Sequence, residues 1–159
     1  MKQTIYIETT IPSYAMSKPS RDLKKTDRQN STLVFWENER HKYDLYVSGY
    51  VIDECNRGDK AAAEKRLQFL DGINLIPTSD DILSLADTYM KLLDIPSKCM
   101  IDSRHLATCV LHQIDILLTW NFTHLGSITE AKLRVYNYQY GLWTPYLLTP
   151  DDLLEGRMV

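Results

Sequence analysis

The chain has 159 residues, of which 44% are hydrophobic and 25% charged, a composition typical of one globular domain with a full core, so we expect a single domain over residues 1–159. The sequence lacks an apolar run of about 18 residues that could span a membrane, and "MKQTIYIETT" lacks the features of a signal peptide, which predicts a cytoplasmic protein without a membrane partner. A net charge of -3 argues against a broadly basic surface for nucleic acid, although the basic stretch from Lys18 to Arg28 fits either a solvated helix start or a phosphate contact.

Short apolar runs alternate with amphipathic stretches along the chain. The predicted strands are Thr4–Ile7, Leu45–Val47, Asn74–Ile76, Ile114–Leu118 and Tyr146–Leu148. The predicted helices are Asp27–His41, Ser48–Arg57, Lys60–Leu70, Asp80–Leu93, Ile101–His112 and Ser127–Tyr140. Because this alternation favours a parallel sheet covered on both faces, we expect an α/β fold, a three-layer α/β/α sandwich with a central, mainly parallel sheet.

Polar side chains follow two of the most apolar predicted strands. Glu8 ends the run "IYIE", and Asn121 follows "DILLTW". In parallel sheets, ligands bind outside the carboxyl ends of the strands, where the connecting loops diverge. Glu8 therefore either caps the segment that follows it or belongs to a group of acids that holds a cation.

Two further acids lie on predicted helices. Glu54 shares a helical face with Val51 and Cys55, which points it toward the packed side, although an exposed Glu54 paired with Arg57 is the alternative. Asp102 stands at the start of a helix, where a carboxylate is also favoured as a simple cap.

These acids can meet at one edge of a parallel sheet. Carboxylates gathered in this way repel one another unless a cation neutralises them. The three cysteines form neither a CxxC pair nor an even set, which predicts reduced thiols rather than a thiolate site. Oxygen ligands without clustered Cys or His favour a hard cation such as Mg²⁺ or Mn²⁺ over zinc.

The order of four segments resembles the PIN domain family, the fold of VapC-type toxin nucleases. These segments are "IYIETTIPSY", "YVSGYVIDECNRG", "IDSRHLATCVLHQIDILLTWNFTHL" and "LLTPDDLL", and together they extend over nearly the whole chain. The resemblance implies a PIN-like α/β/α sandwich. It also implies cleavage of RNA, which members of the family commonly perform with a divalent metal held by three or four acids.

The resemblance assigns roles to four residues. Glu54 and Asp102 match the second and third acids of the family, Glu8 stands where an Asp is usual, and Asn121 stands where many members have a fourth acid. We therefore expect Glu8, Glu54 and Asp102 to bind Mg²⁺ or Mn²⁺. Asn121 completes the expected catalytic set and would supply a neutral oxygen.

Four other side chains have two interpretations each. Thr119 and Ser48 fit hydroxyls that support the metal ligands from behind, or a plain strand end and an N-cap, and for Ser48 we favour the cap. His105 shares the face of Asp102 at i+3, and we favour a partly buried histidine with satisfied nitrogens. His124 fits either a phosphate contact or a plain loop residue.

The function expected from these observations is metal-dependent hydrolysis of RNA, in single-stranded or looped form, by a Mg²⁺ or Mn²⁺ endoribonuclease. The resemblance further implies the toxin of a toxin-antitoxin pair, an antitoxin partner, and a homodimer with contacts around Leu33 to Trp36. One alternative is a catalytically weak or inactive PIN-fold module that binds RNA or an antitoxin. Another is a phosphotransferase on a similar fold, but that chemistry expects an aspartyl nucleophile where Glu8 stands.

Overall fold

The centre of the molecule is a parallel sheet of five strands. The computed structural model describes residues 1–121 and 127–156. The strands are β1 (Thr4–Ile7), β2 (Asp44–Ser48), β3 (Asn74–Ile76), β4 (Ile116–Leu118) and β5 (Tyr146–Leu148). They lie in the order β3-β2-β1-β4-β5, and every neighbouring pair is parallel, which confirms the predicted sheet.

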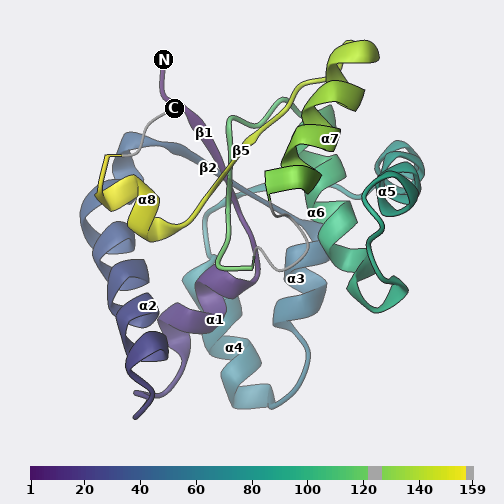
Figure 1. Ribbon diagram of the computed structural model, residues 1–159. Helices are drawn as coiled ribbons and strands as arrows, with labels where there is room; N and C mark the ends of the chain where they lie inside the picture. The colour runs from purple at the N-terminus through teal and green to yellow at the C-terminus, as the bar shows by residue number, and fades with distance from the viewer. Residues whose placement is uncertain (122–126, 157–159) are drawn as a thin grey trace.

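Helices cover both faces of this sheet. Figure 1 shows α1 (Thr10–Met16), α2 (Leu23–Val34) and α8 (Pro150–Leu154) on one side, and α5 (Asp80–Leu92), α6 (Met100–Leu111) and α7 (Ser127–Gln139) on the other. Two more helices follow β2. Of these, α3 (Gly49–Cys55) packs against α6, and α4 (Lys60–Phe69) packs against α1. The expected three-layer α/β/α arrangement is confirmed.

The strand order reverses beside β1. The chain passes from β1 to β2 on one side, and later returns to form β4 on the other side, with Ile7 opposite Leu118. Ile5, Tyr6 and Ile7 are fully buried, because β1 is covered on both faces. The carboxyl ends of β1 and β4 therefore form the crevice at which open α/β sheets bind ligands.

The first long helix differs from its predicted range of Asp27–His41. It begins at Leu23, because the side chain of Asp22 accepts a hydrogen bond from the Lys25 amide and caps the helix. After Val34 it continues as a π-helical turn, η1 (Phe35–Glu39), and then as a 3₁₀ turn, η2 (Arg40–Lys42). The basic stretch between Lys18 and Arg28 therefore contains the start of a helix.

The π-helical turn buries residues that we expected at a dimer contact. Phe35 is fully buried, and the Trp36 ring stacks on Phe69 with centroids 4.0 Å apart. The expectation of contacts around Leu33 to Trp36 is wrong for these two aromatic residues, because the core of the same chain already covers them. Only Val34 of this segment is well exposed.

Three short helical elements were not predicted, and β4 is shorter than expected. The unpredicted elements are α1, α8 and the 3₁₀ turn η3 (Ser97–Cys99). The predicted strand from Ile114 begins only at Ile116, because the Ile114 carbonyl accepts a hydrogen bond from Trp143 Nε1 outside the sheet. All three cysteines are free thiols. Within residues 1–121 and 127–156, no helix combines the length and the apolar character needed to cross a bilayer.

Candidate active site

A small cavity lies at the carboxyl edge of the sheet, beside the ends of β1 and β4. Its volume is about 20 Å³, which is room for about one water molecule or one ion. The lining includes Glu8, Asp102, Thr119 and Asn121, all of which the sequence singled out, and also His105. Apolar side chains complete the wall, namely Ile95, Leu106 and Leu117.

Glu8 is held by one of its two carboxylate oxygens. Its Oε2 accepts hydrogen bonds from the Thr10 amide at 2.9 Å, the Thr10 hydroxyl at 2.5 Å and the Thr119 hydroxyl at 2.8 Å. No described residue donates a hydrogen bond to Oε1. One oxygen of Glu8 therefore binds the first amide of α1, as expected of a cap, and the other oxygen accepts no hydrogen bond from the described residues.

The buried position of Glu8 disfavours its charged form. Burial raises the pKa of the Glu8 carboxyl above its usual value of 4.5, although nearby His105 and the hydrogen bonds from Thr10 and Thr119 oppose this shift. A cation beside Glu8 would oppose this shift, because it would stabilise the carboxylate.

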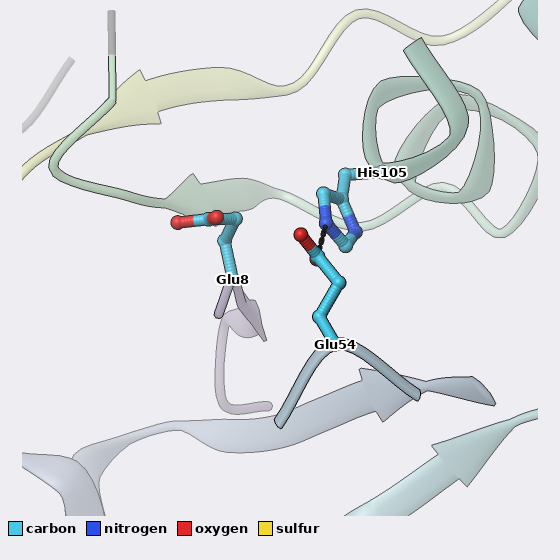
Figure 2. Close-up of side chains that lie close together, drawn as sticks. All are labelled: Glu8, Glu54 and His105. Carbon is cyan, nitrogen blue, oxygen red and sulfur yellow. Dashed lines mark hydrogen bonds and ion pairs between the residues drawn. The ribbon is translucent and has the colours of Figure 1, made fainter. Parts of the chain in front are cut away.

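Glu54 is likewise held by a single oxygen. Its Oε1 accepts a hydrogen bond from the Thr9 hydroxyl at 2.5 Å and lies 2.6 Å from Nε2 of His105. Figure 2 shows Glu54 and His105 pointing toward each other, with their contact drawn as a dashed line. The side chain thus points inward from α3, and its ion-pair partner in the described part of the chain is His105 rather than Arg57. Burial alone would raise the pKa of Glu54, but the hydrogen bond and charge of His105, the Thr9 hydroxyl and the charge of Arg57 together lower it.

His105 joins Glu54 to the sheet. Its Nδ1 lies 2.6 Å from the Tyr6 hydroxyl, which in turn lies 2.6 Å from the Ser48 hydroxyl. Burial alone would lower the pKa of His105, but the hydrogen bond to Glu54 and the charges of Glu8 and Glu54 raise it overall. The side chain is therefore buried with both ring nitrogens satisfied.

Ser48 does not act as the helix cap that we favoured. It occupies the N-cap position of α3, but its side chain makes no capping hydrogen bond. Its hydroxyl faces Tyr6 instead, because the Tyr6 side chain is fully buried and its hydroxyl needs a buried partner. Ser48 reaches Glu54 only through Tyr6 and His105.

Asp102 and Asn121 face each other across the cavity. Asp102 lies in the first turn of α6, and its Oδ2 is 3.5 Å from Nδ2 of Asn121. The backbone amide of Asn121 donates to the Thr119 hydroxyl at 2.9 Å. The same hydroxyl donates to Glu8, so Thr119 connects Asn121 to Glu8. His124, the remaining candidate, lies outside the described residues.

The donor set fits a divalent metal. Ligand atoms of Glu8, Glu54 and His105 lie within 4.8 Å of one another, and the carboxylate of Asp102 lines the same cavity as Glu8. These side chains come from the end of β1, from α3 and from α6. Carboxylate oxygens are ligands for hard cations, so a divalent ion could be held here.

Sequence reasoning named Thr119 as a supporting hydroxyl, and its hydroxyl does bond to Glu8, but it missed the other hydroxyl partners and the contact of His105 with Glu54. Tyr6 gave a signal, since a tyrosine in a strand covered on both faces must bury a hydroxyl that needs a partner. Thr9 and Thr10 directly follow Glu8, so their hydroxyls were within reach of a carboxylate in the same turn. For His105, the only signal in the sequence was its position one helical turn after Asp102.

Comparisons with known proteins give matches among solved structures only. No protein-family model matches the sequence, and no curated protein matches it. The structure is similar to that of VapC20 of Mycobacterium tuberculosis, a toxin that cleaves the sarcin-ricin loop, with a TM-score of 0.60 and 13% identity over 76% of this chain and 92% of that chain. The chain therefore shares the fold of a VapC toxin.

A second solved structure agrees with this result. One chain of the VapBC2 complex of Rickettsia felis, solved with a DNA fragment from the complex's promoter, matches with a TM-score of 0.54 and 16% identity. This match covers 92% of the present chain and 98% of the other. The VapC-like fold thus extends over most of the chain, as the sequence resemblance to PIN domains predicts.

Proposed function

We propose that the chain is a PIN-family endoribonuclease that hydrolyses RNA phosphodiester bonds with Mg²⁺ or Mn²⁺. The observation that carries the proposal is the way its acids are held. Glu8 and Glu54 come from different elements, and each commits one oxygen to hydrogen bonds while the other oxygen accepts none from the described residues. Asp102 adds a third carboxylate to the cavity that Glu8 lines.

This arrangement suits metal-assisted hydrolysis. A divalent cation bound by Glu8, Glu54 and Asp102 would supply Lewis-acid activation of a water and neutralise charge on the phosphate. The hydrogen bonds from Thr9, Thr10 and Thr119 fix the acids before substrate arrives, so little reorganisation is needed during the reaction. Asn121 would orient a water molecule or a phosphate oxygen at the rim through its side-chain amide.

RNA is the proposed substrate, in single-stranded or looped form. The structural similarity to VapC20, which cleaves an RNA loop, supports this choice. The lining of a hollow of about 500 Å³ between the end of α1 and α4 includes three bases, Lys18, Lys65 and Arg66, and one acid, Asp59. The Arg66 guanidinium already donates to the carbonyls of Cys55 and Arg57, so the two lysines are the proposed phosphate contacts.

The protein is further proposed to be the toxin of a toxin-antitoxin pair and to form a homodimer. The similarity to a chain of the Rickettsia VapBC2 complex supports an antitoxin partner. The dimer rests on the resemblance to the PIN family. Its contacts must lie outside Phe35 and Trp36, since both are buried within one chain.

Substitution of Glu8 tests the nuclease. We expect Mn²⁺-dependent cleavage of a single-stranded RNA by the wild type, and a loss of about 100-fold or more in Glu8→Gln, because the change removes a ligand charge but preserves shape. The free energy of unfolding should change by about 1 kcal/mol or less, since the amide can still accept hydrogen bonds. Glu8→Asp keeps the charge but shortens the reach by about 1 Å, so partial activity is expected.

The matched control is Glu39→Gln, because Glu39 is a surface acid paired with Lys42. This variant should cleave RNA at the wild-type rate. Wild-type cleavage by Glu8→Gln, in protein purified free of host nuclease, would make Glu8 a structural residue and contradict the proposal. RNA binding without any cleavage by the wild type would favour the inactive binding module, an alternative that the neutral Asn121 at the fourth position supports.

A further inference from the structure

A hydrogen-bonded chain of buried side chains leads from the middle of the sheet to Glu54. It runs from Ser48 at the end of β2 to Tyr6 on β1, then to His105 on α6 and to Glu54 on α3, and each of its three contacts is 2.6 Å long. Ser48, Tyr6 and His105 are all less than 3% exposed. Ser48 and Tyr6 are thus shielded from water and from any substrate, and His105 borders only the small cavity that it lines.

Both nitrogens of His105 are engaged in this chain. Nδ1 meets the Tyr6 hydroxyl, and Nε2 meets Glu54. The imidazole also lies against the Tyr6 ring, with centroids 5.5 Å apart. Rotation of the imidazole would break both hydrogen bonds in a site that offers little water to replace them, so its orientation is fixed.

The short contact between His105 and Glu54 defines where a proton must be. Two lone pairs cannot face each other at this distance, so a proton lies between Nε2 and Oε1. The hydroxyls of Tyr6 and Ser48 can each turn to donate or accept, so the rest of the chain is satisfied with either state of Nδ1. Nε2 is therefore committed to Glu54 and is not available to a metal unless this contact breaks.

The two carboxylate oxygens of Glu54 therefore have different hydrogen-bond partners. Oε1 receives both the Thr9 hydroxyl and His105, whereas Oε2 receives no hydrogen bond from the described residues. We propose that Tyr6 and His105 are positioning residues that hold Glu54 so that Oε2 is presented to the metal. The proposal rests on the proposed function, and it assigns a role to two residues that are not acids and touch neither metal nor substrate.

Removal of the Tyr6 hydroxyl tests the proposal. Tyr6→Phe retains the ring in the core but frees His105 to turn, and loss of such an outer partner typically weakens metal binding by about 10-fold or more. We expect the Kd for Mn²⁺, measured by titration of the free-ion EPR signal, to rise by about 10-fold. The KM for RNA should stay near the wild-type value while kcat falls at limiting Mn²⁺.

The matched control is Tyr89→Phe. Tyr89 is also fully buried, and its hydroxyl also donates to a polar side chain, Asn137, at 2.5 Å, but it belongs to α5 and does not line the cavity. It should lose a similar amount of stability in urea and keep the wild-type Kd for Mn²⁺. Equal Mn²⁺ affinities for the two variants would overturn the proposal, because the hydroxyl of Tyr6 would then be structural only.

His105 supplies the second test, which separates positioning from ligation. His105→Gln offers an amide donor to Glu54 and should bind Mn²⁺ more tightly than His105→Ala. Electron spin echo spectra of wild-type protein loaded with Mn²⁺ should show no imidazole nitrogen coupled to the ion. A coupling that disappears in His105→Gln would make His105 a ligand and overturn the proposal. A wild type that binds no Mn²⁺ would instead contradict the proposed function itself.

Discussion

Glu8 and Glu54 are both inward-facing acids, but their surroundings act on them in opposite directions. Burial raises the pKa of Glu8 overall, whereas at Glu54 the effect of burial is outweighed by the hydrogen bond and charge of His105 together with the Thr9 hydroxyl and the charge of Arg57, which lower its pKa. Glu54 therefore has a histidine as its hydrogen-bond partner, whereas Glu8 is bonded to neutral amide and hydroxyl donors. A bound cation would relieve Glu8 most, and this difference makes the metal response depend on pH.

The sign of that dependence follows from the direction of each pKa shift. The raised pKa of Glu8 means that the fold holds its proton more tightly than the unfolded chain, so metal-free stability falls as the pH rises from 4.5 through the raised value. Because the pKa of His105 is also raised, metal-free stability falls further as the pH rises above 6.5. The lowered pKa of Glu54 reduces stability only as the pH falls below 4.5, so it does not affect stability at the higher pH values considered for Glu8 and His105.

We therefore predict that Mn²⁺ stabilises the protein more at about pH 7.5 than at about pH 5.5, because the ion competes with these protons. Thermal unfolding at the two pH values, with and without MnCl₂, measures the effect. In Glu8→Gln the dependence on pH should become weaker, since one of the competing protons is absent. A larger rise in Tm at the lower pH would contradict the assignment of Glu8 as a ligand.

At the scale of elements, continuous apolar runs were the most reliable signal. The ranges of β1, β3 and β5 agree with the predicted strands at both ends, and α5 ends one residue before its predicted end. The helix α1 was missed because it has only seven residues, includes Pro12 and follows directly on the acid at the end of β1. The π-helical turn after α2 was missed because it depends on how Phe35 and Trp36 pack in the folded core.

The last helix, α8, carries a local signal that the sequence analysis did not use. Thr149 and Asp152 form a capping box, in which the Thr149 hydroxyl accepts from the Asp152 amide and the Asp152 carboxylate accepts from the Thr149 amide. Pro150 stands at the first turn, where its missing amide hydrogen does no harm. Leu153 is buried, and α8 packs against α2. This cap therefore supports part of one helical layer.

We predict that Thr149→Ala lowers the free energy of unfolding by about 1 kcal/mol, because it removes the side-chain acceptor of the capping box. Urea denaturation measures the change. Thr88→Ala is the control, since Thr88 lies within α5 and its hydroxyl bonds only to the Ser84 carbonyl one turn earlier, so its effect should be within about 0.5 kcal/mol. Equal effects of the two substitutions would show that the cap contributes nothing specific.

At the scale of the whole molecule, the site is an outcome of topology. Glu8, Glu54 and Asp102 come from the end of β1, from α3 and from α6, and beside the reversal of the strand order Glu8 lies close to Glu54 and shares a cavity with Asp102. The sequence could place each acid at an element end or on an inward face, and the parallel sheet then predicted that they meet. It could not predict the contacts of Tyr6 with Ser48 and His105, which lie 42 and 99 residues away, because such pairs depend on side-chain packing.

The proposed metal would link three elements of the fold through Glu8, Glu54 and Asp102, so its binding should be visible in global stability. At a Mn²⁺ concentration about 100-fold above Kd, binding adds about 2.7 kcal/mol to the free energy of unfolding, which corresponds to a rise in Tm of about 5–10 °C for a chain of this size. We predict that Asp102→Asn removes most of this rise, because the change preserves the shape of the side chain but removes a ligand charge. Without metal, the variant should be at least as stable as the wild type, because repulsion among the carboxylates is reduced. The control is Asp53→Asn, an exposed acid next to Glu54 on the solvent side of α3, which should keep the full rise. Differential scanning calorimetry of the three proteins with and without MnCl₂ decides the matter, and a wild-type rise in Asp102→Asn would place that carboxylate outside the metal's coordination shell.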